Sequence, residues 1–217
     1  MPLEEGVPVL LVADVISHVE RDFPHSIAEE WDNVGLQVGP DCLPCRTVMT
    51  CLTVSENAVD HAADLGVDLV IAHHPLIFTP LKTISPQEPT GRIIAKLLTH
   101  HISLYVAHTN VDKARGGLND WLAQTLSILD TKVLERQEKE GIGYGRIGRL
   151  ASPISLTSLV KRVAETLSAG PVRFVGDQDK PLTTVAVCSG SGSHLWPLAL
   201  AQGADVLITG DVKYHTA

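Results

Sequence analysis

The sequence predicts an α/β fold made of two similar lobes, each built on a mixed, largely parallel sheet. Three observations support this prediction: apolar strands alternate with amphipathic helices, the interior is aliphatic, and one βαβ pattern occurs twice. Of the 217 residues, 44% are hydrophobic but only 4% are aromatic, so Leu, Val, Ile and Ala must fill the core. Such a composition is typical of strands that helices cover on both faces.

The first half of the chain shows the alternation clearly. Apolar residues at helical spacing predict a helix over residues 10–23, and the apolar run at 47–54 predicts a buried strand. Ser55 and Glu56 begin the next helix, which we expect to end near Gly66. The other expected elements are strands at 67–72 and 102–107 and helices at 90–101 and 117–127.

The second half follows a stretch rich in lysine and glutamate at residues 132–140. Beyond it the pattern predicts strands at 144–150, 172–175, 183–188 and 205–209, and helices at 156–168 and 195–202. We therefore expect residues 1–217 to form one module of two lobes, approximately 1–130 and 131–217.

An internal repeat supports the two lobes. Residues 47–74 align without a gap with residues 184–211, an offset of 137 positions. Both copies have Thr-Val at the start, a Cys in the first strand and Gly-x-Asp before the second. The Gly is common in any βαβ unit, but the matched Thr-Val and Cys are not. Ligands in open α/β sheets bind beyond the carboxyl ends of strands, so both copies would border one cleft if the lobes face each other.

Charge and hydropathy exclude several classes of protein. The formal net charge is −8, and Lys and Arg are scattered rather than gathered into the patch that a nucleic-acid polymer requires. No apolar stretch approaches the roughly 20 residues of a membrane span, and we see no secretory signal. The lone C-x-x-C at 42–45 lacks the second pair of a structural zinc site. We expect a cytoplasmic protein with reduced thiols that binds neither nucleic acid nor membrane.

Three histidines and an aspartate follow two consecutive predicted strands. His73 and His74 end the first strand, and His108 and Asp112 follow the second. Adjacent side chains on a strand point to opposite faces, so His73 and His74 suit two ions, or one ion and a supporting residue. Imidazole and carboxylate bind zinc and similar first-row metals, and a carboxylate can bridge two ions. The alternatives are ordinary hydrogen bonding for the histidines and turn formation or helix capping for Asp112.

Two further segments carry weaker signals. Asp32 and Asn33 lie in Glu-Trp-Asp-Asn-Val-Gly-Leu at 30–36, which either forms a tight turn before a strand or brings polar contacts to the site. The Gly/Ser loop at 189–193 resembles a phosphate-binding loop but lacks the Lys and the spacing of a P-loop. No Ser-His-Asp or Cys-His arrangement is apparent, so no catalytic residue is assigned.

Together these motifs resemble the NIF-three-like family, whose bacterial members often carry the label GTP cyclohydrolase type-two-like. His-His-Pro at 73–75 and Thr-Asn-x-Asp at 109–112 are the specific motifs. The resemblance covers nearly the whole chain in order, through residues 31–36, 71–78, 107–112, 117–120 and 203–211. The chain has no room for the domain that longer members insert, so it resembles the short form.

The resemblance implies two lobes around a metal-containing cleft, a toroidal homohexamer and two divalent ions per subunit, of zinc, manganese or iron. It makes His73 and His74 ligands of separate ions and Asp112 a further ligand. His108 then supports the ligands or faces the substrate, and Asp32 and Asn33 line the site.

The family label implies a metal-dependent hydrolase that acts on a nucleotide or a related small molecule. In the cyclohydrolase reaction, the attacked atom is C8 of guanine, which is released as formate. The alternatives are a non-enzymatic, ring-forming metal-binding protein with a regulatory or metal-handling role, and a scaffold whose site is inactive.

The sequence departs from the family pattern in two places. Family members supply a further His and Glu, four residues apart, beyond the position of Ala217, and this sequence contains neither. We expect truncation rather than divergence, because the last strand otherwise lacks a covering helix. Thr53 stands where relatives often carry an acid.

Overall fold

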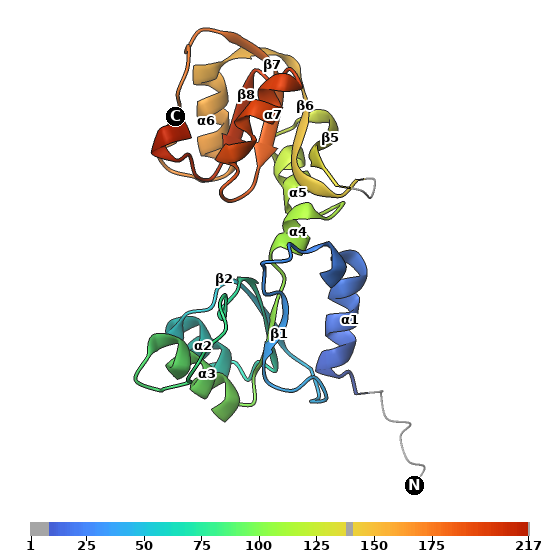
Figure 1. Ribbon diagram of the computed structural model, residues 1–217, viewed down its shortest axis with the longest axis vertical. Helices are drawn as coiled ribbons and strands as arrows, with labels where there is room; N and C mark the ends of the chain where they lie inside the picture. Colours follow the sequence, from blue (N-terminus) through green and yellow to red (C-terminus); the bar gives the residue numbers. More distant parts are fainter. Residues whose placement is uncertain (1–8, 138–140, 217) are drawn as a thin grey trace. The chain divides into compact units, whose positions relative to one another are not determined.

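The computed structural model describes residues 9–137 and 141–216. Within these ranges, every helix is too short or too polar to span a lipid bilayer. The chain forms two compact units, Met1–Val111 and Asp112–Ala217. Each contains a four-stranded mixed sheet with helices, which confirms the predicted α/β class (Figure 1).

The first unit is built on the sheet β1-β4-β3-β2. Parallel pairing joins β2 to β3 and β3 to β4, whereas β1 is antiparallel to β4. In chain order the elements are α1 (Val12–Asp22), η1 (His25–Ile27), β1 (Gly35–Val38), β2 (Val48–Thr53), α2 (Glu56–Asp64), β3 (Leu69–His74), α3 (Pro89–Thr99) and β4 (Ser103–Val106).

Helices cover both faces of this sheet, α1 on one and α2 with α3 on the other (Figure 1). Because side chains alternate along a strand, β3 contributes to two separate clusters. Val70 and Ala72 belong to the cluster that includes α2 and α3, whereas Leu69 and Ile71 pack in the cluster that includes α1. The double burial explains why β3 is apolar from Leu69 to Ala72.

The second unit is built on the sheet β5-β6-β7-β8. Here β5, β6 and β7 are antiparallel neighbours and only β7 and β8 are parallel. The elements are α5 (Leu118–Thr125), β5 (Leu129–Arg136), β6 (Gly143–Ser155), α6 (Leu156–Thr166), β7 (Pro181–Cys188), η2 (Ser193–Leu195), α7 (Trp196–Ala201), β8 (Val206–Thr209) and η3 (Tyr214–Thr216). The short helix α4 (Thr109–Lys113) contains the division between the compact units.

Alternation along β7 again produces two cores. Val185 and Val187 pack in the cluster that contains residues of α5 and α6. Ala186 and Cys188 pack in the cluster that contains residues of α7. The strand β7 is therefore also covered on two faces, which accounts for its apolar residues 185–188.

The repeat extends to hydrogen bonds. Asp68 accepts hydrogen bonds from the backbone N–H groups of Arg46 and Thr47, at 2.7 and 2.9 Å. Asp205 accepts the equivalent pair from Thr183 and Thr184, both at 2.9 Å. The Asp of each Gly-x-Asp thus ties the start of one parallel strand to the start of the next.

One prediction of secondary structure needs correction. Residues 172–175 are not a strand; they lie between Gly170 and Gly176, whose φ angles of 65° and 134° turn the chain away from extended pairing. The charged stretch begins as part of β5, an edge strand whose side chains are largely exposed, and its residues 138–140 lie outside the described residues. The strand β1 begins at the end of the segment at 30–36, as the interpretation of that segment as a turn before a strand expects.

Candidate metal centre

The parallel pairing of β3 and β4 brings His73 and His108 together. Ala72 is paired with Val106 at the carboxyl ends of these strands, and Ala107 N–H donates to the carbonyl of Ala72 at 2.9 Å. The histidines follow directly, His73 as the next residue of β3 and His108 two positions beyond the end of β4. Their ring centroids are 5.0 Å apart.

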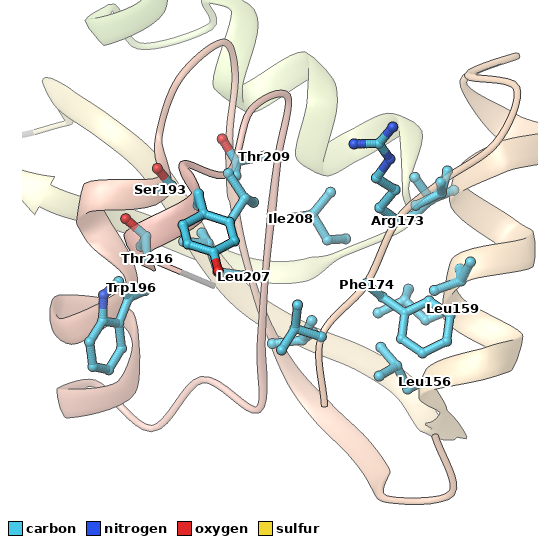
Figure 2. Close-up of a pocket in the computed structure, with 17 residues that line it drawn as sticks. Leu156, Leu159, Arg173, Phe174, Ser193, Trp196, Leu207, Ile208, Thr209 and Thr216 are labelled. Carbon is cyan, nitrogen blue, oxygen red and sulfur yellow. The ribbon is translucent and has the colours of Figure 1, made fainter. Parts of the chain in front are cut away.

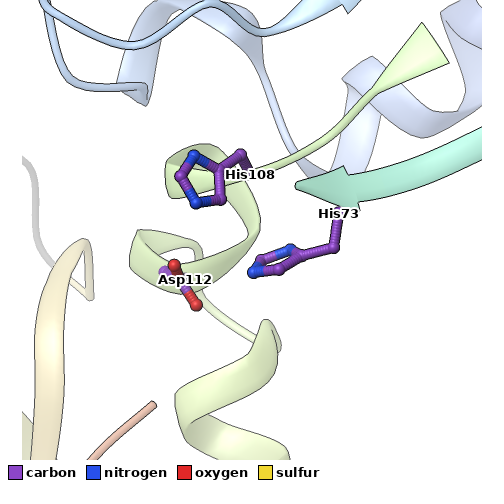
Figure 3. Close-up of side chains that lie close together, drawn as sticks. All are labelled: His73, His108 and Asp112. Carbon is purple, nitrogen blue, oxygen red and sulfur yellow. The ribbon is translucent and has the colours of Figure 1, made fainter. Parts of the chain in front are cut away.

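The helix α4 adds a carboxylate. Asp112 follows His108 by four residues, about one helical turn, and Val111 N–H donates to the carbonyl of His108 at 3.0 Å. One donor atom each from His73, His108 and Asp112 lies within 4.8 Å of the other two (Figure 3). Among residues 9–137 and 141–216, this is the one group of three or more His, Cys, Asp or Glu that comes so close.

Hydrogen bonds fix the tautomers of both imidazoles. Nδ1 of His73 lies 3.0 Å from the carbonyl oxygen of Ala107, which can only accept. Nδ1 of His108 lies 2.9 Å from a carboxylate oxygen of Asp32. Both Nδ1 atoms therefore carry the proton, and Nε2 is left as the nitrogen with the lone pair. A metal-ligating histidine has this arrangement, in which the second nitrogen donates to a carbonyl or carboxylate.

Asp32 is held as a carboxylate by the same network. Its side chain is inaccessible to solvent, and it accepts hydrogen bonds from the hydroxyl and N–H of Thr109 at 2.6 and 3.1 Å. Burial raises the pKa of Asp32, but the hydrogen bonds from Thr109 and His108 outweigh it, so the pKa lies below the ordinary value. Asp32 thus supports His108 rather than joining the group of donors.

His74 lies beside the group rather than in it. Its ring centroid is 5.2 Å from that of His73 and 5.9 Å from that of His108. Its Nδ1 lies 2.7 Å from the Thr53 hydroxyl, at the position where the family pattern has an acid. Asn33, expected to line the site, donates from Nδ2 to the carbonyl of Ile77 at 2.5 Å and so ties its segment to the loop after β3.

Two residues that were not predicted contact Asp112. The Ser189 hydroxyl donates to Oδ1 of Asp112 at 2.7 Å, and Nδ2 of Asn119 donates to its backbone carbonyl at 2.9 Å. Asn119 Oδ1 accepts from Ser189 N–H at 2.8 Å, which closes the network. Ser189 belongs to the Gly/Ser loop at 189–193, so this loop orients the carboxylate of Asp112.

The donor set fits a divalent first-row metal. Two neutral imidazoles and one carboxylate are the ligands of many catalytic zinc sites, which keep a further position for water or substrate. The donor atoms lie close enough for small side-chain rotations to bring them to one ion. The hydrogen bonds to Ala107, Asp32 and Ser189 limit other movements of the three side chains.

The second unit also contains an apolar pocket of about 590 Å³ (Figure 2). Apolar side chains of α6 and β8 form much of its wall, and Arg173 is its one charged residue among those described. None of the predicted site residues lines it. The pocket therefore lacks the convergent donors of a metal centre.

Within the part of the chain that the structure describes, no cysteine belongs to a group of three or more possible metal ligands. Cys42 is exposed and Cys45 is buried, so the two thiols of the C-x-x-C lie in different environments. Burial, with a smaller effect of the Asp112 charge, raises the pKa of Cys188 to about 12. Such a thiol is protonated at neutral pH and contributes to packing.

Known proteins resemble the chain over both units. A sequence profile of the family described as Duf34/NIF3 (NGG1p interacting factor 3) matches residues 10–217. A Streptococcus pneumoniae protein named GTP cyclohydrolase 1 type 2 homolog is 39% identical over 212 residues, which cover 96% of this chain and 79% of that protein. A Lactococcus lactis protein of the same name is 37% identical over 208 residues, covering 94% and 79%. The crystal structure of a Bacillus cereus protein related to NIF3 superimposes with a TM-score of 0.90 at 27% identity, covering 97% of this chain and 85% of that one.

Proposed function

The chain belongs to the Duf34/NIF3 family, and from that premise we propose that it is a divalent-metal-dependent hydrolase acting on a nucleotide or a related small molecule. The observation that carries the proposal is the convergence of donor atoms from His73, His108 and Asp112 within 4.8 Å. The name GTP cyclohydrolase 1 type 2 homolog, borne by relatives from two bacteria, favours hydrolysis of a purine nucleotide.

The side chains have distinct roles in this proposal. Nε2 of His73, Nε2 of His108 and a carboxylate oxygen of Asp112 would hold the ion. A bound divalent ion supplies a Lewis acid that makes water acidic near neutral pH. The carbonyl of Ala107 and the carboxylate of Asp32 keep the protons on the Nδ1 atoms, so that both rings present their lone pairs in one direction.

Other parts of the proposal come from the family resemblance. We include two divalent ions per subunit, of zinc, manganese or iron, with His74 as a ligand of the second. Two lobes of one module, approximately 1–130 and 131–217, surround the metal-containing cleft in the proposed homohexamer. Asn33 lines the site, and the protein acts in the cytoplasm.

The test is a metal-dependent assay of the purified protein. GTP and a set of phosphoesters are incubated with the metal-free protein, with and without added zinc or manganese. We expect turnover that requires the metal and is lost in the His73→Ala/Asp112→Asn double variant. A His61→Ala/Asp64→Asn variant serves as matched control, because both residues lie exposed on or beside α2 and outside the candidate centre. Equal rates in all three proteins would reject the proposal.

A second function is favoured by the family description itself. NGG1p interacting factor 3 names an interaction rather than a reaction. Under this candidate, the chain is a non-enzymatic, ring-forming metal-binding protein with a regulatory or metal-handling role. Stoichiometric metal in the purified protein, together with the absence of turnover on every substrate offered, favours this candidate over the hydrolase.

A further inference from the structure

A polar groove of about 1100 Å³ lies in the second unit, beside the edge strand β5. Its lining comes from the segment between α4 and α5, from β5 and from the β5–β6 hairpin. Four cationic side chains line it, and they are Arg115, Lys132, Arg136 and Arg146. Asp120 is the one acidic residue in the described lining.

Arg146 and Asp120 neutralise each other at the base of the groove. Arg146 is 2% exposed, and its Nε and Nη2 donate to the two carboxylate oxygens of Asp120. The remaining guanidinium hydrogens bind carbonyls, those of Gly143 and Gly145 through Nη1 and that of Ala114 through Nη2. The pair is a rigid, fully bonded part of the structure, and its carboxylate does not compensate the other cations.

The other three cations have no such partner. Arg115, Lys132 and Arg136 are exposed, and none makes a hydrogen bond or ion pair within residues 9–137 and 141–216. By contrast, Arg92, Lys96 and Arg149 each bind a carboxylate on the surface. Three cations that line one groove attract a small anion, and the attraction weakens as salt screens it.

The positions of these side chains are set by the hairpin. The aliphatic part of Arg115 lies over Gly141. A Cβ atom added to Gly141 would lie 3.5 Å from Cδ of Arg115. Lys132 and Arg136 are four residues apart on β5, a spacing of about 13 Å along the strand. Both residues line the groove together with Arg115, so three cationic side chains border the same space.

We propose that this groove binds a small phosphate-bearing anion through Arg115, Lys132 and Arg136. A guanidinium group can donate two parallel hydrogen bonds to two oxygens of one phosphate. The lysine ammonium adds a positive charge on a flexible side chain. The site is distinct in its residues from the metal centre and does not depend on the proposed hydrolase activity. The overall charge of −8 argues against a nucleic-acid polymer, whose long backbone would meet repulsion outside the groove.

The test is a titration of EDTA-treated, metal-free protein with inorganic pyrophosphate at low salt. Isothermal titration calorimetry measures the binding. We expect binding that weakens at least tenfold in the Arg115→Gln/Arg136→Gln variant, and that also weakens when the salt concentration is raised. The control is Lys161→Gln/Arg162→Gln, which removes the same charge from α6 in the same unit and should bind as the unaltered chain does. Thermal melting of each variant checks that it folds.

Two outcomes would overturn the proposal. An equal loss of pyrophosphate affinity in the groove variant and in the α6 control would show that binding depends only on the overall charge of the protein. Loss of binding in His73→Ala, with full binding in the groove variant, would place the anion at the metal centre instead. Because EDTA-treated protein is used, a failure of the hydrolase assay leaves this result unaffected.

Discussion

The buried carboxylate of Asp32 accepts a hydrogen bond from Nδ1–H of His108 at 2.9 Å, although 76 positions separate the two residues in the chain. Asp32 follows α1 and η1, whereas His108 follows β4. Hydrogen bonds from Thr109 hold the carboxylate from the other side, so its position is set by the same segment that carries the imidazole. An Asp in this position both orients the ring and raises its affinity for a cation.

The first prediction concerns this carboxylate. Asp32→Asn removes the charge while keeping the shape of the side chain, so the ring of His108 loses its fixed tautomer. We expect affinity for zinc or manganese to fall by about 10- to 100-fold. Competition with a chromophoric chelator measures the change. Asp64→Asn, at the exposed end of α2, should bind as the unaltered chain does. Unchanged affinity in a folded Asp32→Asn variant would contradict the assigned role.

The second prediction concerns the aspartates of the repeat. Asp205→Ala leaves the N–H groups of Thr183 and Thr184 without their acceptor. We expect the free energy of unfolding at pH 7 to fall by about 1–3 kcal/mol, measured by urea titration. Glu165→Ala is a suitable control, because its pairing with Lys161 is exposed and should contribute less than about 1 kcal/mol. A smaller loss for Asp205→Ala than for the control would show that water replaces the carboxylate at little cost.

The pH dependence of this effect is the third prediction. Backbone hydrogen bonds from Thr184 and Thr183 lower the pKa of Asp205 below its ordinary value of 3.8. A carboxyl with a lowered pKa in the folded state stabilises the protein above the ordinary value, and the stabilisation disappears as the pH falls through the folded value. The difference in unfolding free energy between the unaltered chain and Asp205→Ala should therefore be constant from pH 5 to 7 and shrink below about 3.8. A difference that grows on acidification has the wrong sign for this assignment.

The sequence predicted buried elements better than edge elements. Strands with helices on both faces, such as β3 and β7, contain continuous runs of apolar residues, which are easily recognised in the sequence. The edge strand β5 carries Lys132 and Arg136 and was interpreted as a charged boundary between lobes. The repeat could be predicted because Thr-Val and Cys match between the two copies, whereas the shared hydrogen bonds of Asp68 and Asp205 became visible only in the structure.

The candidate centre was predictable where it follows strand ends. His73 and Asp112 were expected as ligands, and the structure brings them together with His108, which was expected in a supporting role. The helix α4 is only five residues long, too short for a periodic pattern, so the return of Asp112 toward His108 was not visible in the sequence. The contact from Ser189 spans 77 positions and depends on tertiary structure alone.

The fourth prediction concerns the thiols. At pH 8 we expect iodoacetamide to modify Cys42 first, since it is exposed, and Cys188 last. A pKa of about 12 leaves roughly one Cys188 thiol in ten thousand ionised at that pH, and burial also blocks access. Peptide mapping by mass spectrometry follows each site separately. Denatured protein, in which all four thiols should react alike, is the reference; rapid modification of Cys188 in the folded state would refute its burial.

The last prediction separates the roles of His74 and His108. Three imidazole rings lie within 5.9 Å of each other, but only His73 and His108 share the group with Asp112. We call the ion held by His73, His108 and Asp112 the first ion. His108→Ala should weaken binding of this ion by at least tenfold, because the variant loses both a ligand and the hydrogen bond of that ligand to Asp32. His74→Ala should leave the first ion bound and abolish the second, so the stoichiometry falls from two to one.

Calorimetric titration with manganese gives both the affinity and the stoichiometry, and melting curves recorded without metal establish that each variant folds. His100→Ala provides a matched control, since this exposed residue caps α3 and lies outside the group. The reverse result, in which His74→Ala removes the first ion and His108→Ala retains both, would assign the metal to His73, His74 and Asp112. In that case the hydrogen bond between Asp32 and His108 would have to serve the substrate rather than the ion, because a ring that holds no metal still presents Nε2 to whatever binds beside Asp112.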